Sequence, residues 1–321
     1  MVVSVIAERV PFWNPIAAAY LADVIAGSDR TVILLNGADR PISAHLQPFT
    51  VDVQKEMLTL LFPQEVAAGV VAIQAIDDDP YLDEARRRSV EEALDAAGVK
   101  ASEARGVWSS EAAMDEARGL PDFVFDEVRR VESVGSTADL FGDLSPAPLL
   151  APFLDDWRRS DRFRYLLGEH QAAARYRAEW ANAPYEPSFN TADALIEHED
   201  DVLCIVRDRF PFEGFPALPG GFQDPRERLR RTSLREAGEE ASMTPEMMVE
   251  FLVGNAVFDE PDRDPRGRFV SQVYHYRLKG PRPPVKAGSD ARSVLWLPKS
   301  EIVPAKMAFD HGFAVRELLQ L

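Results

Sequence analysis

Residues 220–243 read GGFQDPRERLRRTSLREAGEEASM, and this stretch decides the fold of the second half of the chain. Asp224, Pro225 and Glu227 suit the N-cap, the first and the third position of a helix that begins with a capping box. The pattern predicts that this helix runs to about Ala241.

Three carboxylates gather on one face of the predicted helix. Glu236, Glu239 and Glu240 stand at i, i+3 and i+4, which places their side chains at contact distance. Like charges this close destabilise a helix unless positive charge offsets their repulsion. Hard cations such as Mg²⁺ bind to clustered oxygen ligands and would supply that charge. A solvated acidic face is the alternative explanation for any single EAGEE sequence. A different side of the helix is apolar and can pack on a sheet, through Leu234, Ala237 and Ala241.

The spacing around the carboxylates favours a specific motif over an acidic surface. Six residues stand at the separations G-x5-E-x7-R-E-x-x-E-E: Gly221, Glu227, Arg235, Glu236, Glu239 and Glu240. At about 6% for each residue type, six fixed matches arise by chance at ~10⁻⁷ per start position. The segment resembles the Nudix box of pyrophosphohydrolases. Ser242 stands where that box has Gly, so either Ser242 is strained by about 1 kcal/mol at positive φ, or the helix continues toward Pro245.

The resemblance continues outside the box, over residues 186–321 and the segment just before them. Similarity to the Nudix half of the bifunctional nicotinamide mononucleotide adenylyltransferase/Nudix hydrolases lies in WANAPYEPSFNTADALI, DVLCIVRDR, GFPALPGG, VFDEPDRDPRGRFVSQVYHYRL, AGSDARSVLW and MAFDHG. It implies an α/β/α sandwich with a mixed sheet, and hydrolysis of ADP-ribose to AMP and ribose 5-phosphate. Two alternatives stay open: a Nudix hydrolase of other dinucleotides, and a sensor that binds ADP-ribose without turnover.

The same resemblance assigns roles to the residues of the box. It implies that Mg²⁺ or Mn²⁺ is held by the carbonyl of Gly221 and by three carboxylates, those of Glu236, Glu239 and Glu240. These glutamates are also the expected catalytic residues, and Arg235 is expected to orient them. Cations so placed bridge a diphosphate and lower the pKa of an attacking water. The general base stays open among four acidic residues: Glu240, Glu260, Asp262 and Asp290.

The DRDPRGR loop at residues 262–268 supplies candidate phosphate ligands. Arg263, Arg266 and Arg268 carry planar guanidinium groups that suit a diphosphate, and Gly267 allows close backbone approach. A charged hairpin loop in which Asp and Arg neutralise one another is the alternative. The box upstream favours phosphate contact, most of all for an exposed Arg266. Two further residues are expected to contact the substrate, Gly220 and Phe222.

The first 145 residues alternate β-branched runs with helical patterns, which predicts a doubly wound α/β domain with a parallel sheet. Expected strands are 2–7, 31–35, 69–76 and 122–128, and expected helices are 15–26, 51–61 and 81–97. Residues 146–185 form a predicted helical connector that ends at the prolines of NAPYEPSF. Residues 186–321 form the second predicted domain, with strands at 191–197 and 201–207, the acidic helix, three further strands and a helix from about Phe309.

The N-terminal domain resembles the adenylyltransferase half of the same bifunctional family more loosely, through VVSVIA, PFWNP, RPISAHLQPFT and GSTADLF. In that family a His-x-Gly-His motif after the first strand contacts the nucleotide phosphates. The corresponding positions hold Trp13, Asn14, Pro15 and Ile16, and no histidine precedes His45. The Arg of the Ser/Thr-rich motif is missing too, with Ala138, Asp139 and Leu140 in its place. We therefore expect a catalytically silent, nucleotidyltransferase-like domain that acts in oligomerisation, stability or ligand sensing.

Composition narrows the range of partners. The 321 residues include 36 Lys and Arg against 53 Asp and Glu, a formal charge of -17 that repels nucleic acid. Cys204 is the only cysteine, which excludes an intrachain disulfide and fits a reducing cytoplasm. No apolar run approaches the roughly 20 residues of a membrane span. The expected partner is a small nucleotide, and a homodimer stays open. His311 either lies near that ligand or caps a helix.

Overall fold

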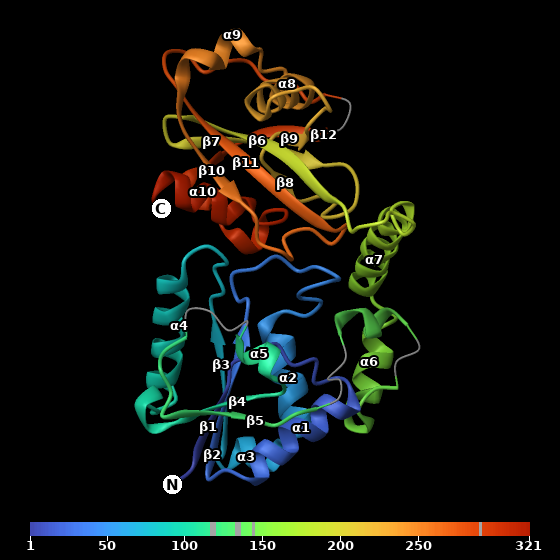
Figure 1. Ribbon diagram of the computed structural model, residues 1–321, viewed down its shortest axis with the longest axis vertical. Coiled ribbons are helices and arrows are strands. Elements are labelled where there is room, and N and C mark those ends of the chain that lie inside the picture. The colour runs from blue at the N-terminus through green and yellow to red at the C-terminus, as the bar shows by residue number, and fades with distance from the viewer. Residues whose placement is uncertain (116–119, 132–135, 143–144, 289–290) are drawn as a thin grey trace. The chain divides into compact units, whose positions relative to one another are not determined.

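The structure is a computed structural model that describes residues 1–115, 120–131, 136–142, 145–288 and 291–321 (Figure 1). The chain divides into two compact units, Met1–Leu167 and Gly168–Leu321. The domain limits predicted from the sequence, 1–145, 146–185 and 186–321, stay a proposal. None of the described helices is both long and apolar enough to cross a bilayer.

A five-stranded parallel sheet forms the middle of the first unit, in the order β3-β2-β1-β4-β5. Its strands are β1 (Val3–Ile6), β2 (Arg30–Asn36), β3 (Val71–Ile76), β4 (Arg105–Trp108) and β5 (Phe125–Val128). Its helices are α1 (Pro15–Ala26), α2 (Val51–Leu61), α3 (Pro63–Ala67), α4 (Asp83–Ala96), α5 (Glu111–Asp115) and α6 (Ala151–Trp157). The strand order runs outward from β1 in both directions, so the predicted doubly wound class is confirmed.

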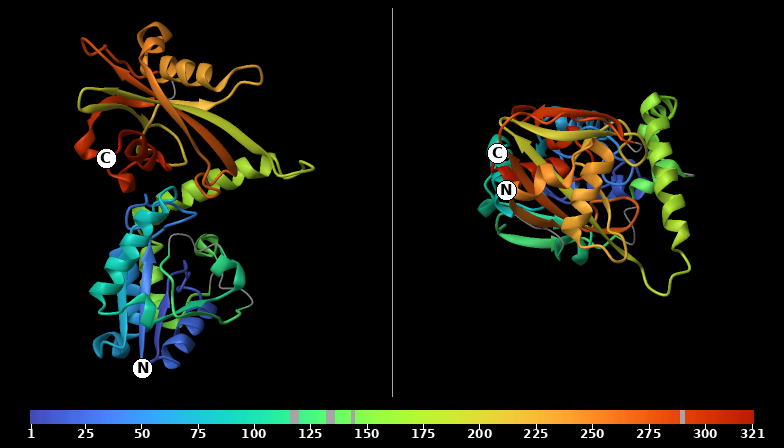
Figure 2. Two further views of the ribbon diagram at one scale, coloured as in Figure 1. Left: turned by 60° about the vertical axis from the view of Figure 1, so that its left-hand side comes forward. Right: turned by 90° about the horizontal axis from the view of Figure 1, so that it is seen from above.

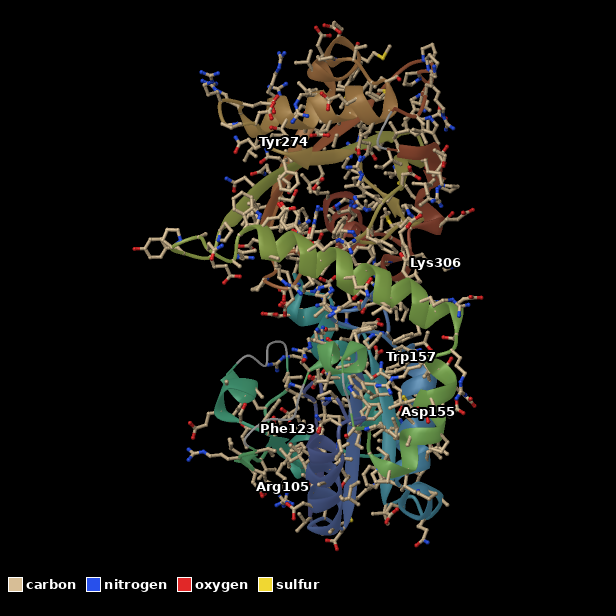
Figure 3. The ribbon with its side chains drawn as sticks, turned by 90° about the vertical axis from the view of Figure 1, so that its right-hand side faces the viewer. Arg105, Phe123, Asp155, Trp157, Tyr274 and Lys306 are labelled. Carbon is tan, nitrogen blue, oxygen red and sulfur yellow. The ribbon has the colours of Figure 1, made fainter. Side chains whose placement is uncertain are left out.

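Helices cover both faces of this sheet. Apolar residues of α1 and α2 form one buried cluster with β1 and β2, and α4 forms another on the opposite face. The predicted ends of α1 are confirmed, because the Asn14 side chain accepts a hydrogen bond from the Ile16 N–H and Gly27 follows the last turn. Trp157 of α6, labelled in Figure 3, packs on the first cluster with its ring centroid 4.6 Å from that of Phe49.

The prediction missed β4, which pairs with β1 and β5 in the middle of the sheet. Its four residues RGVW contain a glycine and are too few to show the period of a strand. Pairing with two neighbours supplies the hydrogen bonds that the local sequence does not signal.

A seven-stranded mixed sheet forms the middle of the second unit, with the path β10-β11-β6-β7-β12 and two short strands paired beside it. Its strands are β6 (Ser188–His198), β7 (Asp201–Arg207), β8 (Pro216–Ala217), β9 (Gly220–Phe222), β10 (Leu252–Phe258), β11 (Arg268–Leu278) and β12 (Ala291–Pro298). The β6–β11 pair is parallel, and the other pairs are antiparallel.

Helices lie on both sides of the mixed sheet, which confirms the predicted α/β/α sandwich. They are α8 (Leu229–Ala241), α9 (Pro245–Met248) and α10 (His311–Leu319), with α7 (Asp161–Glu179) preceding β6. Figure 1 and Figure 2 show α8 and α10 on opposite sides of the sheet. As predicted, Leu234, Ala237 and Ala241 pack on the sheet, in a cluster with Ile196 and Tyr276.

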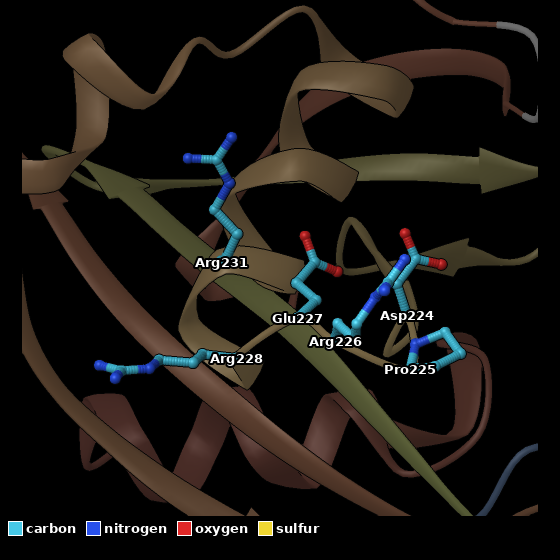
Figure 4. Close-up of a pocket in the computed structure, with 6 residues that line it drawn as sticks. All are labelled: Asp224, Pro225, Arg226, Glu227, Arg228 and Arg231. Carbon is cyan, nitrogen blue, oxygen red and sulfur yellow. The ribbon is translucent and has the colours of Figure 1, made fainter.

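The predicted start of α8 is wrong. The helix begins at Leu229 with Arg228 as its N-cap, and Asp224 instead accepts a turn hydrogen bond from the Glu227 N–H. The capping box fails because the Glu227 carboxylate bonds the Thr232 hydroxyl and Arg235. Figure 4 shows this turn, with Arg228 and Arg231 pointing away from Glu227.

The predicted end of α8 is confirmed at Ala241, and the question about Ser242 is answered. Ser242 adopts a left-handed conformation with φ 59° and ψ 27°, so the helix does not continue toward Pro245. A glycine would adopt this conformation without strain. The Ser242 hydroxyl donates a hydrogen bond to the Lys286 carbonyl oxygen at 3.1 Å, which offsets part of the strain.

Candidate active site

Two glycines allow β9 to lie between β6 and α8. A Cβ atom on Gly220 would come within 1.9 Å of an Asp193 carboxylate oxygen, and one on Gly221 within 2.5 Å of a Glu236 carboxylate oxygen. Gly220 therefore requires glycine, because its Cβ would also lie 2.8 Å from the Asp193 Cα, whereas a side chain at position 221 would displace the Glu236 carboxylate. β9 pairs with β6 through Gly220 and Asp193, so the Asp193 carboxylate from β6 comes to lie beside the box.

Arg235 connects the acidic residues of the box. Its guanidinium donates to Glu227 at 3.1 Å, to Glu236 at 2.7 Å, to Glu239 at 3.0 Å and to the Phe222 carbonyl at 2.9 Å. Hydrogen bonds from Arg235 and Thr232 outweigh the effect of burial and hold the pKa of Glu227 below its ordinary value. Arg235 is thus placed to orient the glutamates.

Glu240 is the most deeply buried carboxylate of the box. Its side chain accepts a hydrogen bond from the Gly220 N–H at 2.9 Å, and only 8% of the residue is exposed. Burial, with repulsion from Glu236 and Asp193, raises the pKa of Glu240 to about 8. Burial also raises the pKa of Glu236, with a contribution from the charges of Glu239 and Asp193.

A cleft of about 290 Å³ opens beside these carboxylates. Predicted site residues in its walls are Gly220, Gly221, Phe222, Arg235, Glu236, Glu240, Arg263, Arg266 and His311. Within the described part of the chain, the walls of the cleft do not include Glu239 or Arg268. They also do not include the candidate bases Glu260 and Asp262. The fourth candidate base, Asp290, lies outside the described residues.

The arginines of the 262–268 loop have carboxylate partners of their own. Arg263 forms a buried bidentate pair with Asp310, at 2.8 and 2.6 Å. Arg266 pairs with Asp264 at 2.6 Å, and its side chain is only 19% exposed, so the expectation of an exposed Arg266 is wrong. Arg268 donates to the carbonyl of Asp259 instead of pointing into the cleft.

Sequence reasoning missed Arg207, which lies at the end of β7 in the cleft wall. Its guanidinium donates to the Pro211 carbonyl at 2.8 Å and lies 4.8 Å from the Phe309 ring centroid. Within the described part of the chain it forms no ion pair. Burial and repulsion from Arg266 lower the pKa of Arg207 to about 10. Its position as the last residue of a mostly buried strand was the available signal.

His311 lies in the cleft wall as the first residue of α10. Its Nδ1 accepts a hydrogen bond from the Leu218 N–H at 2.9 Å, and its Nε2 is 3.9 Å from an Asp193 carboxylate oxygen. Burial lowers the pKa of His311, so the ring is neutral at pH 7. A neutral ring in this position holds the segment that leads into β9.

The donor chemistry of the cleft fits a hard divalent cation. Glu236, Glu240 and Asp193 bring carboxylate oxygens to its walls, and burial together with mutual repulsion raises the pKa of both glutamates despite the nearby arginines. As the side chains stand, no group of three or more His, Cys, Asp or Glu residues in the described ranges is arranged to hold an ion. Arg235 occupies oxygens of Glu236 and Glu239.

The raised pKa of Glu240 predicts a pH-dependent stability. Because its pKa rises from 4.5 in the unfolded chain to about 8 in the folded chain, the folded state loses stability as pH rises through this window. Glu240→Gln removes that loss. In the presence of chelator, the Tm of the variant minus that of the wild type should grow from pH 5 to pH 8. A difference independent of pH would contradict the assigned shift.

Comparison with known proteins agrees with this geometry. Residues 187–318 match the family model described as NUDIX domain. The ADP-ribose pyrophosphatase of Methanocaldococcus jannaschii is 35% identical over 128 residues, which cover 40% of this chain and 71% of that protein.

Two solved structures share the fold over nearly the whole length. Both are of a bifunctional NMN adenylyltransferase/ADP ribose pyrophosphatase from Francisella tularensis, one of them complexed with AMP and a Mn ion. They have a TM-score of 0.86, identities of 23% and 22%, and coverage of 99% of this chain and 98% of theirs. The chain belongs to the Nudix family, and it is a hydrolase of pyrophosphate bonds.

Proposed function

We propose that the chain hydrolyses ADP-ribose to AMP and ribose 5-phosphate with a divalent cation, Mg²⁺ or Mn²⁺. The observation that carries the proposal is that one cleft joins the box carboxylates Glu236 and Glu240 to the guanidinium groups of Arg207 and Arg266. Support comes from the name of the M. jannaschii relative and from the AMP and Mn ion in the F. tularensis structure.

We assign different residues of the cleft to binding the cation and to binding the diphosphate. Glu236, Glu240 and the Gly221 carbonyl would hold the cation, with Glu239 able to join them if it leaves Arg235. A bound dication supplies charge neutralisation for the diphosphate and lowers the pKa of a water. Arg235 keeps Glu236 oriented, and Glu240 accepts the proton of the attacking water at its carboxylate.

Arg207 and Arg266 would bind the diphosphate from the other wall. Arg207→Ala should lower kcat/KM for ADP-ribose about tenfold or more, since a charge-assisted contact is worth roughly 1.5 to 3 kcal/mol. Its Tm should fall less than that of Arg266→Ala, because the variant loses a hydrogen bond to the Pro211 carbonyl but leaves no carboxylate without an ion-pair partner.

Arg266→Ala is the matched comparison. It leaves Asp264, whose side chain is 2% exposed, without its ion-pair partner, so both kcat/KM and Tm should fall. An unchanged kcat/KM in Arg207→Ala, measured by initial rates beside thermal unfolding, would remove Arg207 from the site.

We further propose that the N-terminal unit is catalytically silent. Trp13, at a position of the missing histidine motif, is 5% exposed and packs in the core, with its ring centroid 5.5 Å from that of Phe49. Asn14 caps α1, and Ile16 carries no polar side-chain atom. Side chains in these roles supply no imidazole to a phosphate.

The experiment that tests the function uses a panel of substrates. The protein is incubated with Mg²⁺ or Mn²⁺ and with ADP-ribose, dinucleoside polyphosphates or NAD, and the products are identified by mass. AMP and ribose 5-phosphate from ADP-ribose support the proposal. Preferred cleavage of another member would assign a different Nudix substrate, and tight binding of ADP-ribose without product would make the chain a sensor.

A further inference from the structure

Arginines gather in the turn that leads from β9 into α8. Four of the six residues 226–231 are arginine, although the whole chain carries a formal charge of -17. Three of them are exposed and line an open pocket of about 640 Å³, namely Arg226, Arg228 and Arg231. In Figure 4 the side chains of Arg228 and Arg231 extend away from the two acidic residues of the pocket. A positively charged patch therefore interrupts an acidic chain.

These three arginines have no carboxylate partner within the described ranges. None of their guanidinium groups forms an ion pair or a hydrogen bond with a described residue. The two acidic residues of the pocket both face Arg235: Glu227 accepts a hydrogen bond from it at 3.1 Å, and Asp224 pairs with it at 3.9 Å. The fourth arginine, Arg230, donates to the Val249 carbonyl at 3.0 Å and does not line the pocket. The described protein therefore does not offset the three charges.

Helix stability does not account for these arginines. Arg228 and Arg231 are three positions apart at the start of α8, where side chains at i and i+3 are neighbours and like charges are unfavourable. Arg228 is also the N-cap residue, and its side chain forms no capping hydrogen bond. A small polar residue such as Ser would stabilise this end of the helix better. An anionic ligand, in contrast, would use the charge that the helix does not need.

The lining of the pocket indicates the class of anion. None of its described lining residues is aromatic, so the pocket offers no ring on which a base could stack. Guanidinium groups match phosphate oxygens, to which they can donate paired hydrogen bonds, and three such groups can contact more than one phosphate. A long polyanion is disfavoured, because the net charge of the chain would repel the parts that extend beyond the patch.

We propose that this pocket, formed by Arg226, Arg228 and Arg231, binds a small anion that carries two or more phosphate groups, without recognition of a base. The site goes beyond the proposed function. It shares Asp224 with the cleft, but none of its three guanidinium groups lies in the walls of the cleft. Arg207, which is assigned to the substrate diphosphate, does not line the pocket. The anion therefore binds in addition to the substrate.

The test measures binding of inorganic tripolyphosphate by isothermal titration calorimetry, in chelator and at low ionic strength. The wild type should bind tripolyphosphate and should bind orthophosphate at least about tenfold more weakly, because a single phosphate contacts fewer guanidinium groups. Arg228→Ser and Arg231→Gln should each weaken tripolyphosphate binding about tenfold, the order expected for one charge-assisted contact. Ser is a preferred N-cap residue, so Arg228→Ser should not lower the Tm.

A matched pair of triple variants separates the pocket from general charge. Arg226→Gln combined with the two changes above should weaken tripolyphosphate binding at least about a hundredfold. The control combines Arg87→Gln, Arg88→Gln and Arg162→Gln, which alter three exposed arginines outside the pocket and change the net charge by the same amount. It should bind like the wild type. An equal loss in both triple variants, or wild-type affinity in the pocket variant, would overturn the site.

Two other locations of the charge are tested in parallel. Arg207→Ala alters the cleft and leaves the pocket unchanged, so it should retain tripolyphosphate binding; loss of binding in this variant would assign the anion to the cleft. The arginines could instead pair with acidic residues of a second copy of the chain. Sedimentation velocity would then show a wild-type dimer that the pocket variant dissociates, and the absence of tripolyphosphate binding would overturn the proposal. None of these measurements requires turnover, so failure of ADP-ribose hydrolysis would leave the anion site in place.

Discussion

Glu240→Gln should lower ADP-ribose hydrolysis at least about a hundredfold, the lower limit for loss of a proton acceptor in the reaction. Glu240 is buried at the cleft and also lies in the proposed cation site. Glutamine keeps an oxygen that can accept the hydrogen bond from Gly220, but it carries no charge and cannot take up a proton. The backbone around β9 should therefore persist while the reaction stops.

Two glutamates serve as comparisons for Glu240. Glu246→Gln changes an exposed residue of α9 that is not part of the cleft wall, and it should hydrolyse ADP-ribose like the wild type. Glu239→Gln should have an effect of about tenfold, because its side chain is 58% exposed and reaches the site through Arg235. Steady-state rates for all three are measured at saturating cation. Wild-type turnover in Glu240→Gln, or full activity of the wild type in excess chelator, would remove the metal mechanism.

The 321-residue chain should form no NAD from nicotinamide mononucleotide and ATP. That reaction builds negative charge on the α-phosphate and the departing pyrophosphate, and removal of a single donor to such charge costs about 10² to 10³ in rate. Trp13 is in the core and Ile16 has no donor in its side chain, so two donors are missing at once. At the Ser/Thr-rich motif, Asp139 uses its carboxylate to accept a hydrogen bond from the Ser136 N–H.

The measurement is a coupled assay for NAD formation with Mg²⁺ and ATP. It uses the Glu240→Gln variant, so that the Nudix half cannot destroy the product. A wild-type member of the bifunctional family provides the positive control. NAD formation on the order of 1 s⁻¹ or more would show an active domain with catalytic residues elsewhere.

Local periodicity was sufficient to predict how the box is arranged. Glu236 and Glu240 lie on one helix, and an α-helix fixes which of its side chains share a face whatever surrounds it. The same holds for the ends of α1, where the cap residues act within one turn. The start of α8 could not be predicted in this way, because Glu227 had two competing roles and its bonds with Arg235 and Thr232 prevailed.

Residues brought together by long-range pairing escaped prediction. Asp193 reaches the box only because β9 pairs with β6, and β9 is three residues long. Arg263 looked like a phosphate ligand because its partner Asp310 is 47 residues away in the chain. The role of Arg207 depends on which arginines already have carboxylate partners, and that follows from tertiary structure alone.

The central claim is that the cleft hydrolyses the diphosphate bond of ADP-ribose. The most direct measurement incubates the wild-type protein with ADP-ribose and Mg²⁺ or Mn²⁺ in ¹⁸O-labelled water and determines product masses. Our account predicts AMP and ribose 5-phosphate, with a single ¹⁸O atom carried by one of the two, and no product in chelator. Intact ADP-ribose after prolonged incubation with either cation, or release of a product that still contains the diphosphate, would contradict it.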